Sequence, residues 1–187
     1  MKKPLLIIVS GPPCSGKTAL GRRLAKELSL PFINKDGIKE SLFDALGWKD
    51  REWSQQLGRA SSELLLYFAE TQLAAAHSLI IESNFDPKFA TSRLLALKAN
   101  VDFEPFQVQC IAAGDILFQR FKARAESGER HPGHVDHLNY AEFQATLIPK
   151  RHYALEIGGS VIEVDTTDFQ QIDYDRLITT VRLALVQ

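Results

Sequence analysis

One short motif restricts the fold of this chain more than any other feature. Residues 11–18 read GPPCSGKT and match G-x-x-x-x-G-K-[ST], the pattern of a loop that wraps around phosphate groups. The residues just before it, 5–9, form the uninterrupted apolar run LLIIV, which is typical of a strand buried on both faces of a parallel sheet. A segment with helix-forming composition follows. Because the motif requires this order of strand, loop and helix, the sequence predicts a phosphate-binding loop (P-loop) in an α/β fold.

The residue types of the motif suit a bound anion. Gly11 and Gly16 permit a tight turn whose backbone N–H groups point inward, and the helix N-terminus adds positive charge. Lys17 is predicted to contact the β- and γ-phosphates of ATP, and Thr18 to bind Mg²⁺ through its hydroxyl. ATP and Mg²⁺ are therefore the expected cofactors. The residues assigned to nucleotide binding in the loop are Gly11, Pro12, Pro13, Cys14, Ser15, Gly16, Lys17 and Thr18.

Short apolar runs alternate with segments of helical pattern along the rest of the chain. This alternation predicts right-handed β-α-β crossovers and a parallel sheet with helices on its faces. No repeat or Pro/Gly/Ser-rich linker divides the sequence, so residues 1–187 are expected to form a single domain. The expected strands are 5–9, 32–34, 79–81, 106–111 and 161–164, and the expected helices are 16–28, 37–46, 52–77, 87–99, 114–127, 138–154 and 174–186.

Composition and charge exclude several classes of protein. A hydrophobic share of 45% and a charged share of 24% are ordinary for a globular domain. With 22 basic and 23 acidic residues the chain lacks the overall positive field that binds nucleic acid non-specifically. Cys14 and Cys110 form no disulfide framework, and residues 5–9 are too short for a signal peptide core. We therefore expect a cytoplasmic protein without a membrane partner.

Asp36 follows the second expected strand, where the crevice of an open α/β sheet binds ligands. A carboxylate there would accept the proton of an acceptor hydroxyl as that hydroxyl attacks the γ-phosphate, which makes Asp36 a candidate catalytic base. Lys39, three residues on, would hold an anionic group of the substrate. The alternative is that Asp36 caps the following helix, a common role for aspartate.

The third expected strand also ends in polar residues. Glu82 would lie beside the phosphate-binding loop and hold Mg²⁺ through water, and Asn84 would face the substrate. Polar residues at strand ends are ordinary turn formers as well. Asp86-Pro87 has the pattern of a helix start, with aspartate at the cap and proline in the first turn, and is interpreted as structural.

Residues 120–137 have the features of a lid. Arg120 and Arg124 lie four residues apart on one helix face and precede a loop rich in glycine, proline and histidine. Arginine that arrives on closure stabilises the transferring phosphoryl group, so both are assigned to catalysis and Arg130 to nucleotide binding. The alternative for such a pair is a solvated helix face. Three histidines recur here, but no fourth ligand at a recognisable spacing supports zinc, and a solvated or substrate-contacting loop is the favoured interpretation: His131, His134 and His137.

The combined pattern resembles the small P-loop kinases that include polynucleotide 5′-kinases, chloramphenicol phosphotransferase and zeta toxins, an AAA-type ATP-binding group. The residues that carry the likeness are GPPCSGKT, Asp36 with Lys39, the run ESNF at 82–85, and Arg120 with Arg124. The resemblance implies a three-layer fold with a five-stranded parallel sheet in the order 2-3-1-4-5 and a helical lid. It also implies that Asp36 is the general base and that lid arginines act on the γ-phosphate.

The sequence leaves the acceptor open. The leading hypothesis is an ATP- and Mg²⁺-dependent kinase that phosphorylates a hydroxyl on a small molecule, with residues 37–77 as a helical insertion over the acceptor site; Trp48 and Trp53 are candidate walls of that site. A polynucleotide or nucleotide-sugar kinase is the alternative. A nucleic-acid end is less favoured because Lys39 stands where polynucleotide kinases tend to have arginine. A third hypothesis is a non-catalytic nucleotide-binding regulator.

Overall fold

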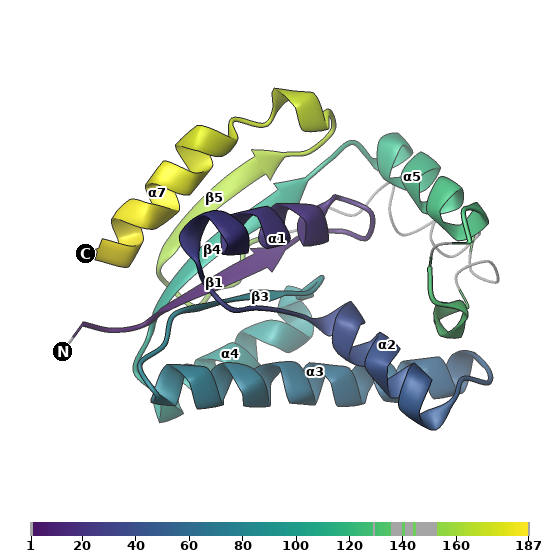
Figure 1. The fold of residues 1–187 in the computed structure, drawn as a ribbon, viewed down its shortest axis with the longest axis horizontal. Coiled ribbons are helices and arrows are strands. Elements are labelled where there is room, and N and C mark those ends of the chain that lie inside the picture. Colours follow the sequence, from purple (N-terminus) through teal and green to yellow (C-terminus); the bar gives the residue numbers. More distant parts are fainter. Residues whose placement is uncertain (1, 129, 136–139, 141–143, 145–152, 187) are drawn as a thin grey trace.

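A single parallel sheet organises the chain in the computed structural model, which describes residues 2–128, 130–135, 140, 144 and 153–186. The strand order is β2-β3-β1-β4-β5, which confirms the predicted α/β fold and topology (Figure 1). The strands are β1 (Leu5–Ser10), β2 (Phe32–Asn34), β3 (Leu79–Glu82), β4 (Glu104–Ile111) and β5 (Ser160–Asp165). The helices are α1 (Lys17–Leu28), α2 (Lys35–Leu46), α3 (Arg51–Ala74), α4 (Pro87–Asn100), α5 (Gly114–Glu126) and α7 (Tyr174–Val186), with 3₁₀ turns η1 (Pro132–His134) and η3 (Phe169–Gln171).

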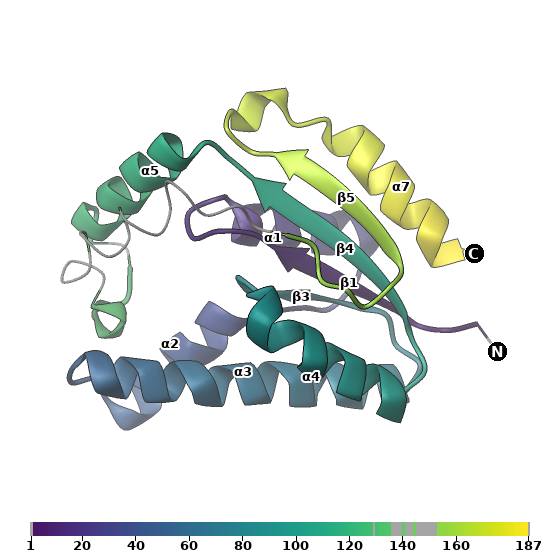
Figure 2. The ribbon, with the colours of Figure 1, turned by 180° about the vertical axis from the view of Figure 1, so that it is seen from behind.

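Helices cover both faces of the sheet, because successive side chains of β1 point to opposite sides. Ile7 and Val9 pack with the apolar faces of α1 and α7, whereas Leu6 and Ile8 pack with those of α3 and α4. These side chains are fully buried. Figures 1 and 2 show the resulting three layers, with α1 and α7 on one face and α3 and α4 on the other.

Two helices, α2 and α5, lie at the carboxyl edge of the sheet rather than on its faces (Figure 1). The strand register explains which residues meet there. Val9 pairs with Glu82, and Asn34 pairs with Glu82 from the other side, so β1, β2 and β3 end level with one another. The residues that follow these strands therefore emerge at one place, next to the phosphate-binding loop.

Element boundaries differ slightly from the sequence expectation. Helix α2 begins at Lys35, two residues earlier than expected, because Gly37 does not interrupt its first turn. Helix α3 ends at Ala74, three residues before the expected end. The predicted cap at Asp86 is confirmed, since its carboxylate accepts a hydrogen bond from the Lys88 backbone N–H. The helix expected over residues 138–154 lies for the most part outside the described residues.

The start of α3 gives a prediction of modest size. Asp50 accepts a hydrogen bond of 2.9 Å from the Trp53 backbone N–H and so caps the helix. Asp50→Ala removes this bond and is expected to lower the free energy of unfolding by about 1 kcal/mol. Urea unfolding of both proteins measures the change, and Asp50→Asn, which keeps an acceptor oxygen, should lose less. Equal losses in the two variants would contradict the capping role.

None of the helices in the described part of the chain is long and apolar enough to cross a membrane.

Candidate active site

Residues 11–18 form a loop whose backbone leaves the range that most side chains prefer. Cys14 has φ 64° and Gly16 has φ 79°, and left-handed residues of this kind turn successive N–H groups toward a common centre. A Cβ on Gly11 would lie 2.3 Å from the Cys110 carbonyl oxygen, and one on Gly16 would lie 2.4 Å from Phe169. Both glycines of the motif are thus required by close approach as well as by backbone angle.

Two buried polar atoms beside this loop fit a phosphate ligand. Among the described residues, Ser15 Oγ and Arg120 Nη1 are buried without a hydrogen-bond partner. Lys17 is also buried, and its ammonium donates to the Pro12 carbonyl at 2.7 Å. Burial lowers the pKa of Lys17, while the neighbouring Glu82 carboxylate opposes that change. A bound anion would satisfy these donors, so the loop suits the phosphates of a nucleotide.

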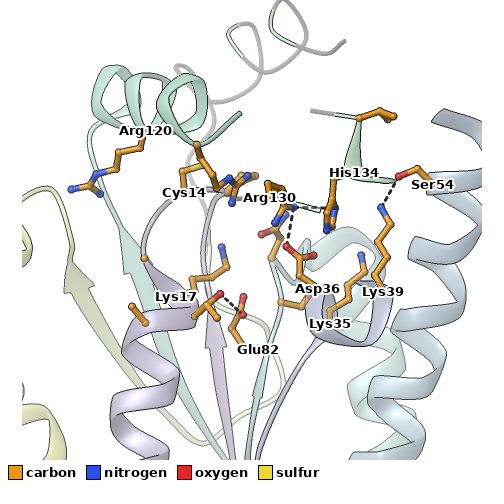
Figure 3. Close-up of a pocket in the computed structure, with 18 of the residues that line it drawn as sticks. Cys14, Lys17, Lys35, Asp36, Lys39, Ser54, Glu82, Arg120, Arg130 and His134 are labelled. Carbon is orange, nitrogen blue, oxygen red and sulfur yellow. Dashed lines mark hydrogen bonds and ion pairs between the residues drawn. The ribbon is translucent and has the colours of Figure 1, made fainter. Parts of the chain in front are cut away.

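Thr18 and Glu82 are the two residues predicted to hold a magnesium ion. The Thr18 hydroxyl donates to Glu82 Oε2 at 2.8 Å, so the two oxygens lie together at the base of the loop (Figure 3). Burial raises the pKa of Glu82, and the charge of Lys17 and the Thr18 hydrogen bond favour the ionised carboxylate. Hydroxyl and carboxylate oxygens are the ligands Mg²⁺ prefers, so these residues fit the predicted metal role.

Asp36 lies in the first turn of α2, opposite the loop, and its carboxylate accepts a hydrogen bond from Arg130 at 3.1 Å (Figure 3). Its oxygen is thus directed to Arg130, whereas the capping alternative would direct it to backbone N–H groups of α2. Burial raises the pKa of Asp36, but the Arg130 guanidinium outweighs burial, and the pKa falls to about 2. The carboxylate is ionised at neutral pH.

The arginines of the lid differ in where they point. Arg120 donates to the Thr167 carbonyl at 2.8 Å and stacks 4.0 Å from the centre of the Phe169 ring, away from Asp36 (Figure 3). Arg130, in contrast, binds Asp36. Arg120 therefore faces the loop after β5, a position that its four-residue spacing from Arg124 did not indicate.

A single cavity of about 580 Å³ brings most of the predicted site together. It is lined by predicted loop, base, substrate and lid residues, whereas Gly11, Pro12 and Ser15 do not line it. Sequence reasoning missed several lining residues that lack a motif, among them Lys35, Ser54 and Phe169. The predicted residues in the lining are Pro13, Cys14, Gly16, Lys17, Thr18, Asp36, Lys39, Glu82, Asn84, Arg120, Arg124 and Arg130.

Other candidates contribute differently from the expectation. Trp48 and Trp53 are absent from the cavity lining; Trp53 Nε1 donates to the Gly47 carbonyl, and Trp48 packs edge-on against His131. Lys39 does line the cavity, where its ammonium donates to Ser54 Oγ at 2.8 Å. Within the described residues no three His, Cys, Asp or Glu side chains are grouped to hold a metal ion, and His137 lies outside those residues.

The fold and the loop geometry define a P-loop nucleotide-binding domain. The AAA domain family matches residues 6–149, and the chain belongs to this family. Family membership and fold together identify a kinase-like P-loop domain, for which ATP is the expected nucleotide.

Solved structures agree with this assignment. A candidate kinase from Chloroflexus aurantiacus J-10-fl is 41% identical, with 97% of this chain and 98% of that chain covered and a TM-score of 0.93. A sugar kinase from Janibacter sp. HTCC2649 is 17% identical, with 99% of this chain and 95% of that chain covered and a TM-score of 0.58. Kti12 from Chaetomium thermophilum is 17% identical, covering 97% and 99%, with a TM-score of 0.60. The last two share the fold alone. No curated protein matches the chain.

Proposed function

We propose that the chain is a Mg²⁺-dependent kinase that transfers the γ-phosphate of ATP to a hydroxyl group of a small molecule. The observation that carries the proposal is that Asp36 and Lys17 line the same cavity, with a carboxylate facing a phosphate-binding loop. A nucleotide-binding switch needs the loop but has no need of an ionised carboxylate in the same cavity.

Each residue has a defined part in this reaction. Asp36 would accept the proton of the acceptor hydroxyl as the hydroxyl oxygen bonds to the γ-phosphorus. The bond between the γ-phosphorus and the bridging oxygen of ADP would break at the same time, and Lys17 would offset the charge on the departing ADP. Arg124 and Arg130 would stabilise the transferring phosphoryl group. Thr18 and Glu82 would hold Mg²⁺, which when bound neutralises charge on the phosphate oxygens.

The walls of the cavity favour a small acceptor. Its acceptor side is bounded by Lys39 from α2, by Ser54 and Gln55 from α3, and by His134 and Val135 from the segment that follows α5. Asn84, after β3, also lines the cavity and would contact the substrate. Three separate parts of the chain therefore surround the acceptor, as expected for a molecule taken into a pocket.

The experiment that tests the proposal is a screen for acceptor-stimulated release of ADP. Pools of sugars, hydroxy acids, nucleosides and aminoglycosides, and in a separate arm oligonucleotides with a 5′-hydroxyl, are added to the protein with ATP and Mg²⁺. We expect a small-molecule pool to raise ADP release above the basal rate. Stimulation by the oligonucleotide alone would support the alternative of a polynucleotide kinase. No stimulation by any pool, together with tight ATP binding, would support a non-catalytic regulator.

Thr18 gives a direct test of the metal assignment. Thr18→Val preserves the shape of the side chain but removes the hydroxyl that contacts Glu82. We expect the Mg²⁺ concentration for half-maximal ADP release to rise about 10-fold, because one ligand of the ion is lost and each 1.4 kcal/mol corresponds to a factor of ten. Thr18→Ser keeps the hydroxyl and is the matched control. An unchanged Mg²⁺ requirement in Thr18→Val would exclude Thr18 as a ligand.

A further inference from the structure

The segment 130–135, which contains η1, contacts three regularly spaced carboxylates of α2. Three acidic residues of α2 follow one another at four-residue intervals and so lie on one face of the helix. Each meets a basic side chain of the segment in a contact that joins residues about ninety positions apart, and Glu40 also lies 3.9 Å from Arg130 Nη1. The pairs are Arg130 with Asp36 at 3.1 Å, His134 with Glu40 at 3.0 Å, and His131 with Asp44 at 3.2 Å.

Phe43 gives this contact a defined shape. Its ring is fully buried, stacks on the His131 ring with centroids 5.0 Å apart, and meets the edge of the His134 ring at 5.5 Å. A Cβ on Gly133 would lie 2.7 Å from the same ring, so the backbone of the segment rests directly on Phe43. The segment is therefore placed by packing as well as by charge.

His134 makes two hydrogen bonds that fix its protonation state. Arg130 Nη2 lies 3.0 Å from His134 Nδ1, and because a guanidinium can only donate, Nδ1 is the acceptor. His134 Nε2 lies 3.0 Å from Glu40 Oε1. An ionised carboxylate has no proton to donate, so Nε2 is the donor in this hydrogen bond. The neutral ring with its proton on Nε2 satisfies both partners. Burial, followed by the charge of Arg130, lowers the pKa of His134 to about 3, so this form persists at neutral pH.

We infer that His134 is a positioning residue, which holds the Arg130 guanidinium against Asp36 through Nδ1 while Glu40 fixes the orientation of the ring. The inference rests on the proposed function in one respect, because it takes Asp36 as the residue that faces the acceptor hydroxyl. The His134 side chain is only 4% exposed, so the imidazole ring has little freedom to adopt another orientation. Arg130 is thereby ordered beside the phosphate-binding loop before any ligand arrives, which lowers the entropy cost of forming the site.

The charge state of Asp36 reports the position of Arg130. The charged and titratable groups around Asp36 are Arg130 and His134 from the segment, Lys35 on α2, and Lys17 and Glu82 at the sheet edge. Burial raises the pKa of Asp36, and Arg130 makes the largest opposing contribution. If Arg130 moves away, burial prevails and Asp36 takes up a proton at a higher pH. His134 stays neutral above about pH 4 and does not confuse the measurement.

The test is an NMR titration of the protein labelled with ¹³C at the aspartate carboxyl carbons. The Asp36 signal is the one lost in Asp36→Asn. We expect no titration of Asp36 between pH 4 and 8 in the natural protein. In His134→Leu its midpoint should rise by at least about two pH units, from about 2 into this pH range. If the leucine variant does not fold, His134→Gln serves in its place. The glutamine amide reaches the Nε2 position but not the Nδ1 position, so the same shift is expected. His134→Asn places an acceptor oxygen near the Nδ1 position and should restore the natural behaviour.

Asp44→Asn is the matched control, because it weakens the seating of the segment through His131 without touching Arg130 or His134. We expect it to leave the Asp36 midpoint unchanged. An unshifted midpoint in His134→Leu and His134→Gln, or an equal shift in Asp44→Asn, would overturn the inference. The titration needs no phosphoryl transfer. If Asp36 shifts as expected but Asp36→Asn keeps full turnover, the positioning role stands and the proposed base is wrong.

Discussion

Lys17→Ala is expected to lower acceptor-stimulated ADP release by about 10³-fold. Lys17 is the buried cation of the loop, and its ammonium lies at the Pro12 carbonyl, from which a bound phosphate would draw it. Alanine would remove the charge that offsets the leaving phosphate oxygens and the positive charge that favours the ionised form of Glu82. Both changes weaken nucleotide binding, so the affinity for ATP should fall together with turnover.

The measurement compares ADP release and ATP binding in the natural protein and in two lysine variants. Lys26→Ala is the matched control, because Lys26 lies on the same helix, α1, with an exposed side chain in its last turn. It should leave both quantities unchanged. Turnover in Lys17→Ala within about tenfold of the natural rate would contradict the role assigned to the phosphate-binding loop.

Asp36→Asn is expected to lower turnover by about 10²- to 10⁴-fold while ATP binding stays nearly unchanged. Asparagine has the shape of aspartate but cannot accept the proton of the acceptor hydroxyl, and its amide pairs less strongly with Arg130. The control is Asp175→Asn, because Asp175 also lies in the first turn of a helix, α7, but is exposed, and no effect is expected there.

The low pKa of Asp36 has a consequence for the pH dependence. Arg130 overcomes burial and brings that pKa to about 2, so Asp36 is ionised throughout the range in which the protein is assayed. Protonation of Asp36 should therefore cause no loss of activity between pH 8 and pH 5. A carboxylate of such low basicity orients the hydroxyl more than it pulls its proton away, which suffices for the loose transition state of phosphoryl transfer.

The sequence was sufficient for the sheet and the phosphate-binding loop, because their signals are local. The apolar run 5–9 predicts a strand, and the glycines at 11 and 16 predict the turn and the start of the helix that directly follow it. The convergence of Asp36 and Glu82 was also predictable, since parallel strands that end level with one another bring the following residues to one edge.

The contacts of the lid could not be predicted in this way. His134 meets Glu40 across 94 positions, and Arg120 meets Thr167 across 47, and neither pair has a spacing that a pattern could reveal. From spacing alone, the histidines indicated a solvated or substrate-contacting loop, with a metal site less favoured. Their partners are carboxylates of α2, the helix whose Phe43 packs against Gly133.

The most direct test of the central claim, that the loop and Asp36 form one phosphoryl-transfer site, is to measure ATP affinity and acceptor-stimulated ADP release side by side in Asp36→Asn. An acceptor found in the pool screen is used at saturation, and ATP affinity is measured by calorimetry. The account predicts an ATP dissociation constant within about threefold of the natural value and turnover reduced by at least about 100-fold. Unchanged turnover in Asp36→Asn, with Lys17→Ala inactive, would contradict it.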